Sequence, residues 1–433
     1  MAPPKSQRSS HPKSRDRDSA SAVGALISEA ERQALAMPLS PPQEDETLFD
    51  LGEVYFLLGS TSQAKMYQNL GSILGANMLK EVALDIQSNA TRQSIAFYRA
   101  SHDMYEKVVA RDSLVLKQEA LINSGNSLCD WAELLPPAMG SSLFEKADLW
   151  YTAALSESAD DVELLTNFAD CKVKRAELEM LIESSLPEAQ PWSKAKEFYS
   201  RAMSAYGHAC SLADTNKGDD LAGLLQNWGA SLSSLAQHTP DSQEALLAHD
   251  QAMEKLRNAA KFRPTDVTIF IAIGEACSAY AERIPQAQAL ELLATSVDEG
   301  FGVALKIDAN CMDAILGEAE SHLAAGKLAR IIGMESAAKN HYGRSLNSYL
   351  RALQMLRADE KNECKLKFEE QCNVLYNLAC VAALCSQESV AAEALTLLAR
   401  VGGFSPSDLA EDADLQTLQT KEWFVSLRKK MIH

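Results

Sequence analysis

Residues 225–264, LQNWGASLSSLAQHTPDSQEALLAHDQAMEKLRNAAKFRP, contain the pattern that decides the fold. In the second half of this stretch, Ala252, Leu256 and Ala259 follow one another at spacings of four and three residues. Those spacings place the three side chains on one stripe of an α-helix, where the small residues allow another helix to come close. Pro264 then ends the helix. The stretch therefore predicts a packing helix with a sharp stop.

The first half of the same stretch predicts a partner helix. Leu225, Trp228, Gly229 and Leu232 give a large apolar residue, a second one three positions later, then a glycine and a further apolar residue. A glycine inside a helix costs about 1 kcal/mol relative to alanine, so its presence needs a compensating contact. We expect Gly229 to lie where the two helices of one hairpin touch.

The small–large–small pattern recurs along the chain, which indicates an internal repeat. Its eight copies are Ala64/Gln68/Gly71, Ser101/Tyr105/Val108, Ala147/Tyr151/Ala154, Ala202/Tyr206/Ala209, Ala252/Leu256/Ala259, Val297/Phe301/Ala304, Ser345/Tyr349/Ala352 and Ala391/Leu395/Leu398. In two places the partner-helix Gly or Ala precedes the next copy by twelve positions, from Gly52 to Ala64 and from Ala379 to Ala391. Each of these two pairs is expected to form one hairpin.

These paired signatures resemble the tetratricopeptide repeat, whose pattern is Trp-x2-Leu-Gly-x2-Tyr followed by Ala-x3-Phe, Ala and Pro. The resemblance covers residues 46–402. It implies an all-α fold, a right-handed α-solenoid of about seven to eight antiparallel helical hairpins. Successive copies lie 37 to 55 residues apart, which is more than the 34 of the family. Longer helices or loops are therefore expected, and the register stays open across residues 162–222.

The chain divides into three parts in this interpretation. Residues 1–44 are a basic, Ser- and Pro-rich tail that we expect to be disordered. Residues 45–403 form the repeats, and residues 404–433 form capping helices, in which Trp423 and Phe424 can cover the apolar end of the stack.

The acidic balance of the chain argues against two kinds of partner. The formal net charge of −18 repels the phosphates of nucleic acids and of anionic lipids. No stretch approaches the 18 uninterrupted apolar residues that a membrane span needs. We therefore expect no nucleic acid partner and no stable membrane insertion, and a helical-repeat RNA-binding protein is the weakest of the alternatives.

Signatures of catalysis and of metal or cofactor binding are missing from the sequence. It contains no His-Glu-x-x-His, no Gly-x-Ser-x-Gly, no Walker loop and no dinucleotide fingerprint. Its nine cysteines are scattered without a Cys-x-x-Cys pair. His208 and Cys210 are close together, but two residues do not make a zinc site. We expect no enzyme, no catalytic residue, no metal and no cofactor.

The first helices of the hairpins are expected to line a concave groove that binds other proteins. In four of them an asparagine stands two positions before the Gly or Ala, namely Asn123, Asn167, Asn227 and Asn377. In the O-linked N-acetylglucosamine transferase superhelix, which belongs to the family that this sequence resembles, such asparagines form a ladder that holds peptide backbone. A carboxamide can both donate and accept a hydrogen bond, so these four are the candidate binding residues. Asparagine is also common at this position in the family whatever the ligand.

Acidic residues fall on the same first helices, at Asp50, Glu53, Glu119, Glu163, Asp170, Glu275, Asp313 and Glu318. If they share the concave face, the groove would select basic or amphipathic partners. A generally solvated acidic surface is the alternative interpretation.

Taken together, these features predict a scaffold, adaptor or assembly factor that binds a partner protein through an extended or helical segment. The alternative is a co-chaperone or an organelle-import type of receptor. The carboxylate clamp that grips acidic chaperone tails needs Lys and Arg on the first helices, where Glu119, Asn123 and Gln226 stand instead. We expect the protein in the cytoplasm, with plastid or nucleus as alternatives.

Overall fold

The computed structural model describes residues 45–68, 80–111, 116–184, 192–213, 218–358, 368–401 and 405–431. Within these ranges the regular structure is helical and contains no strand, so the all-α prediction is confirmed. The expected disordered tail, residues 1–44, lies outside the described residues, and so does Gly71 of the first repeat copy.

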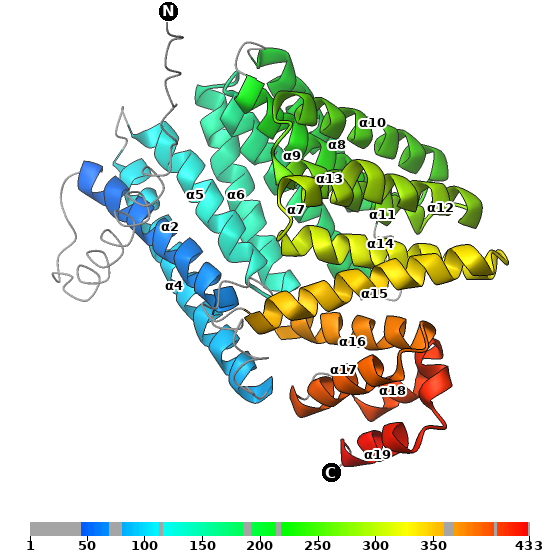
Figure 1. The fold of residues 1–433 in the computed structure, drawn as a ribbon. Helices are drawn as coiled ribbons and strands as arrows, with labels where there is room; N and C mark the ends of the chain where they lie inside the picture. Colours follow the sequence, from blue (N-terminus) through cyan, green and yellow to red (C-terminus); the bar gives the residue numbers. More distant parts are fainter. Residues whose placement is uncertain are drawn as a thin grey trace, which may run out of the picture.

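Successive helices pair as antiparallel hairpins that stack side by side into a helical solenoid (Figure 1). The hairpins are α2 (Asp45–Gln68) with α4 (Lys80–Ala110), α5 (Lys117–Glu133) with α6 (Pro137–Glu157), α7 (Val162–Ser184) with α8 (Trp192–Leu212), α9 (Gly218–His238) with α10 (Ser242–Phe262), α14 (Met312–Ile331) with α15 (Glu335–Ala358), and α16 (Phe368–Leu384) with α17 (Glu388–Val401). Between α10 and α14, helix α11 (Val267–Ala281) pairs with an arm built from α12 (Gln286–Thr295), the π-helical turn η1 (Ser296–Phe301) and α13 (Gly302–Ile307).

The small–large–small stripes form the core of the hairpins. At most 1% of each side chain is exposed in six copies, Ser101/Tyr105/Val108, Ala147/Tyr151/Ala154, Ala202/Tyr206/Ala209, Ala252/Leu256/Ala259, Ser345/Tyr349/Ala352 and Ala391/Leu395/Leu398. The stripes therefore pack inward, as the spacing predicts, and their burial removes apolar surface from water in every hairpin that carries one.

Glycines of the first helices lie where the large residue of the stripe packs. A Cβ atom added at Gly229 would lie 2.6 Å from Cγ of Leu256, and one added at Gly125 would lie 2.7 Å from the ring of Tyr151. A methyl group does not fit at such distances. The expected close contact at Gly229 is confirmed.

The N-terminal hairpin corrects the expected pairing of Gly52 with Ala64. Both residues belong to the single helix α2, and Gly52 packs instead against Tyr105 of α4, whose ring would lie 2.6 Å from an added Cβ. Another glycine between them, Gly59, does not end the helix, because the ring of Tyr98 lies against it in the same manner at 2.8 Å. Gly59 is thus a second packing position and not a turn.

The repeat copy at Val297 is displaced by one residue. Ser296 is fully buried and Val297 is only partly buried, because the π-helical turn inserts one extra residue before Phe301. Ser296 donates a hydrogen bond from Oγ to Oγ of Ser321, at 3.0 Å. The small residue of this copy is therefore Ser296, five positions before Phe301.

The C-terminal residues cover the last hairpin. Helix α18 (Pro406–Glu411) starts with a capping box between Ser405 and Asp408, and it is followed by η2 (Ala413–Leu418) and α19 (Glu422–Lys430). Leu409, Leu415, Leu418 and Phe424 from these segments are buried in the same core as α16 and α17.

The stack curves far enough for helices distant in sequence to meet. Figure 1 shows the N-terminal hairpin in blue approaching the orange C-terminal helices, and α4 contacts α16. Among the helices of the described ranges, none has the length and apolar character required to cross a bilayer.

Candidate functional site

A cavity of about 970 Å³ lies along the first helices of the last three hairpins, α11, α14 and α16. Helix α14 supplies one side of it from Asp313 to Leu328, and Asn373, Val374 and Asn377 of α16 close the opposite side. Part of the lining is an apolar strip. It consists of Leu316, Ala324 and Leu328 of α14 and of Ala281, Ile284, Leu293 and Phe301 from the neighbouring hairpin. A cavity of this size holds several side chains of a ligand.

Carboxylates dominate the polar lining. Glu275 and Glu282 come from the end of α11 and the turn after it, and Asp313 and Glu320 come from α14. Across the described part of the chain, none of these four forms an ion pair with a protein cation. The cation in the lining, Lys327, is already neutralised, because its Nζ lies 2.6 Å from Oδ2 of Asp414.

The surroundings of the cavity raise the pKa of two of these carboxyl groups. Desolvation raises the pKa of Glu275 above its usual value, and the charges of Asp313 and Glu320 raise it further. Desolvation also raises the pKa of Glu320. Both side chains stay accessible to solvent, so they remain available to a ligand while their negative charges repel one another across the α11–α14 contact.

Two buried aromatic rings form the deepest part of the lining. Phe301 is 2% exposed and Tyr349 is 0% exposed. Desolvation and then the charge of Glu320 raise the pKa of Tyr349, whereas the side chain of Asn377 beside the hydroxyl opposes this change. The hydroxyl oxygen itself is closed off from solvent.

The four predicted asparagines do not share one environment. Asn377 lines the cavity, whereas Nδ2 of Asn227 donates to Oδ2 of Asp170 at 3.1 Å. Asn123 lies next to the hydroxyl of Tyr105, and Asn167 is partly buried on α7. A continuous ladder of the four stays a prediction.

The predicted acidic residues separate into several groups. Glu275 and Asp313 line the cavity, but Glu318 accepts a hydrogen bond from Oγ of Ser348 at 2.8 Å. Asp170 accepts from the hydroxyl of Tyr206. Near the N-terminal end, the charges of Glu119 and Asp50 raise the pKa of Glu53, after desolvation.

Sequence reasoning missed Glu282, Glu320 and Tyr349 as lining residues. Glu320 lies two residues after Glu318, and the direction in which each of them projects depends on how α14 packs against α11 and α15. Tyr349 carried a signal as the large residue of its stripe, but only the packing places this residue at the border of a cavity.

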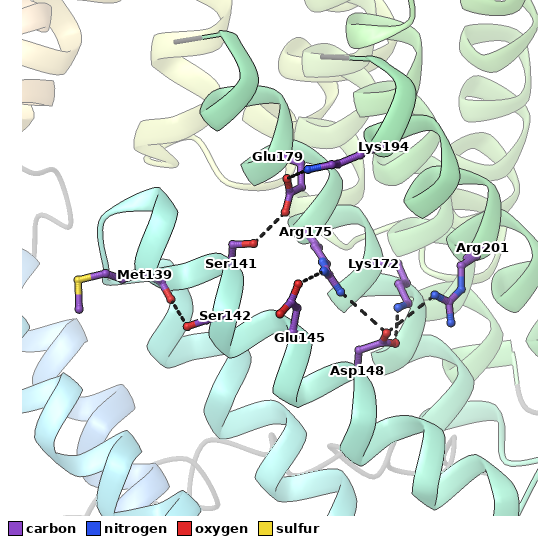
Figure 2. A network of polar contacts seen from close by, with 10 residues as sticks. All are labelled: Met139, Ser141, Ser142, Glu145, Asp148, Lys172, Arg175, Glu179, Lys194 and Arg201. Carbon is purple, nitrogen blue, oxygen red and sulfur yellow. Dashed lines mark hydrogen bonds and ion pairs between the residues drawn. The ribbon is translucent and has the colours of Figure 1, made fainter. Parts of the chain in front are cut away.

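A second cluster of charged residues joins α6, α7 and α8. Figure 2 shows Lys172 and Arg175 of α7 and Arg201 of α8 directed toward Asp148 of α6. Lys172 donates a hydrogen bond to Asp148, and Arg175 donates one to Glu145 at 2.9 Å. Three cations of this cluster thus pair with two carboxylates, and all three cations lie in residues 162–222, where the sequence left the register open.

Within the described ranges, neither a metal site nor a reactive cysteine is well supported. Cys380, Asp412 and Asp414 could offer ligand atoms to one ion, but the ammonium of Lys327 already contacts Asp414. Burial raises the pKa of the Cys277 thiol to about 12, and it raises the pKa of Cys380 as well. Thiols of this kind are poor nucleophiles at neutral pH because their thiolate form is scarce.

No family model and no curated protein sequence matches this chain. Among solved structures, the chain is similar to the S. pombe nuclear import adaptor Nro1, with 12% identity, a TM-score of 0.42, and coverage of 74% of this chain and 98% of Nro1. Yeast Tom70 has 13% identity and a TM-score of 0.24, with coverage of 95% and 97%. Human IFIT1 has 12% identity and a TM-score of 0.23, with coverage of 95% and 94%. At these scores the likenesses assign no function to this chain.

Proposed function

We propose that this protein is a non-enzymatic adaptor that holds a segment of a partner protein in the groove along α11, α14 and α16. The observation that carries the proposal is the cavity of about 970 Å³, which combines an apolar strip with ionised groups on three consecutive first helices. Protein-binding clefts combine apolar contact area with a few polar groups that fix orientation. An extended or a helical segment can satisfy both.

The charge of the groove argues against two alternatives. Glu275, Glu282, Asp313 and Glu320 would repel the phosphates of RNA. They would equally repel the acidic tail that a co-chaperone receptor grips. A partner segment that lacks net negative charge fits the lining better than either ligand.

A substitution that fills the groove tests this proposal. Ala324 lies in its lining, so Ala324→Trp fills the space that a ligand needs. Affinity purification from the native source should lose the partners of the wild type, while the melting temperature stays close to that of the wild type. Leu316→Trp is a second blocking variant in case the first one folds poorly. Ala153→Trp, at an exposed position of α6, is the matched control. If both blocked variants retain the same partners, the groove is not the binding surface.

The asparagine ladder is tested separately. Replacing Asn123, Asn167, Asn227 and Asn377 together by Ala should weaken partner capture severalfold and leave the helical circular dichroism signal near that of the wild type. The physical reason is the loss of carboxamides that can pair with peptide backbone. Capture that is unchanged would remove the ladder and leave the groove proposal intact.

For its location we propose the cytoplasm, with the nucleus or a plastid as the alternatives. A fluorescent fusion of the full chain distinguishes the three compartments directly.

A further inference from the structure

The groove has an excess of negative charge that the protein does not neutralise. Glu275, Glu282, Asp313 and Glu320 have no cationic partner in the described ranges, and Lys327 is engaged with Asp414. Asp148 of α6, by contrast, lies near Lys172, Arg175 and Arg201. The four carboxylates of the groove are therefore open to pairing with a cation from outside the protein.

The unpaired charges lie close together. Glu275, Asp313 and Glu320 line the same cavity from the contacting helices α11 and α14. The charges of Asp313 and Glu320 add to desolvation in raising the pKa of Glu275. Like charges that face one another weaken the empty protein. A ligand cation between them would turn this repulsion into attraction.

The apolar strip suits the stem of a long basic side chain. Leu316, Ala324 and Leu328 follow one another along α14 beside the carboxylates. Long basic side chains bury their methylene groups against such surfaces and keep the charged end among polar groups. Arginine fits better than lysine, because its planar guanidinium has five N–H donors, is more weakly hydrated and stacks on aromatic rings.

We infer, on the basis of the function proposed above, that the partner segment inserts an arginine side chain between Glu275, Asp313 and Glu320. The apolar residues beside this arginine in the partner contact Leu316 and Leu328. The groove thus binds basic, partly apolar protein segments in preference to acidic ones.

Defined peptides test the charge requirement with the full chain. The probes are acetyl-Ala-Leu-Xaa-Leu-Ala-amide with arginine, citrulline, lysine or glutamate at Xaa, titrated by calorimetry or by nuclear magnetic resonance. Citrulline has nearly the shape of arginine without its charge. We expect the arginine peptide to bind at least tenfold more tightly than the citrulline peptide, and its affinity to fall as salt is raised. Equal binding of these two peptides, or no binding of the arginine peptide, overturns the inference.

Variants locate the effect in the groove. Glu275→Gln, Asp313→Asn and Glu320→Gln combined should abolish the preference for arginine over citrulline. The charge-matched control is Asp250→Asn, Glu254→Gln and Glu291→Gln, which changes exposed residues outside the lining and should keep the preference. A groove triple variant that keeps the preference contradicts the inference.

Failure of this inference can be told apart from failure of the proposed function. If Ala324→Trp loses the native partners while the groove triple variant keeps them, the adaptor function stands and the basic-segment inference falls. If Ala324→Trp and Leu316→Trp both keep the native partners, the proposed function falls, and the inference falls with it.

Discussion

At the scale of single residues, the ammonium of Lys172 shows how this acidic protein handles a buried charge. Its side chain is 0% exposed, and its Nζ lies 4.9 Å from the ring centre of Phe168. Desolvation lowers its pKa, and the hydrogen bond to Asp148 opposes that change. Asp148 is therefore the group that makes the buried charge tolerable, with further support for Asp148 from Arg175 and Arg201 (Figure 2).

Asp148→Asn should destabilise the protein by about 3 kcal/mol, because removing one partner of a buried ion pair leaves the other charge uncompensated. Chemical unfolding monitored by circular dichroism measures the change. Adding Lys172→Met to the same chain should recover most of the loss, since the uncompensated ammonium is then gone and Arg175 keeps its pair with Glu145. Glu157→Gln, which breaks the exposed pair with Lys117, is the control and should cost less than about 1 kcal/mol. A double variant as unstable as Asp148→Asn alone would contradict this explanation.

Histidines of α14 and α15 make the stability dependent on pH. His322 is 6% exposed, and its Nδ1 lies 3.2 Å from Nδ1 of His341. Desolvation, then the charges of His341 and Arg344, lower the pKa of His322 from 6.5 to about 4, whereas Asp298 acts in the opposite direction. Between pH 6.5 and pH 4 the imidazole of His322 is protonated in the unfolded chain but neutral in the folded protein. The free energy of unfolding therefore falls as the pH falls from 6.5 to 4.

His322→Asn should flatten this part of the pH profile. The wild type should lose up to about 3 kcal/mol more than the variant between pH 7 and pH 4, because each pKa unit corresponds to about 1.4 kcal/mol. Urea unfolding of both proteins at several pH values measures the difference. Parallel profiles for the two proteins would show that His322 does not titrate in this window.

At the scale of helices, close crossings set the geometry of the hairpins. One such crossing lies between α11 and η1, where a Cβ atom added at Gly300 would lie 2.5 Å from the backbone of Gly274. The π-helical turn brings Gly300 and the ring of Phe301 onto this crossing together. Backbone cannot move aside as a flexible side chain can, so the crossing tolerates no added methyl group.

Gly300→Ala should therefore destabilise the protein by about 1–3 kcal/mol through overpacking. Gly343→Ala on α15 is the matched comparison, because a Cβ added there meets nothing within 4 Å. That change should stabilise by up to about 1 kcal/mol, since alanine favours the helix. Thermal unfolding of both variants measures the two effects, and a loss of stability in both would argue against the crowding at Gly300.

At the scale of the whole molecule, the C-terminal segments close one end of the stack. A terminal hairpin of a solenoid has no neighbour on its outer side and needs a cover. Phe424 is 0% exposed within the core of α16 and α17, and Nε1 of Trp423 donates to Oε1 of Glu388 at 2.7 Å. The groove lies on α11, α14 and α16, so this cover also supports the helix that closes its far side.

Phe424→Ala should cost about 3 kcal/mol or more, because it removes a buried aromatic side chain and leaves a cavity. Hydrogen exchange should quicken first in α16 and α17, which lose their outer support. Val425→Ala, at an adjacent position that is 36% exposed, is the control and should change little. Uniform loss of protection along the whole chain would show that the cover acts globally.

The sequence by itself determined the class of fold and most of the core. Spacings of four and three residues specify one face of a helix whatever surrounds it, which is why six of the eight stripes are buried as expected. Recurrent glycines such as Gly229 also predicted close helix contacts, because a glycine inside a helix lowers its stability unless a contact compensates.

Tertiary structure alone decided the partners of each helix and the contents of the groove. Gly52 could pair with the stripe twelve residues on or with Tyr105, and only the unbroken helix α2 settles this in favour of Tyr105. The displacement from Val297 to Ser296 comes from the π-helical turn, which also brings Gly300 against Gly274. Likewise, Glu275, Glu320 and Tyr349 line one cavity because two hairpins stack. Local spacing fixes which face of a helix is apolar, but the neighbours of that face are chosen by packing between residues far apart in the chain.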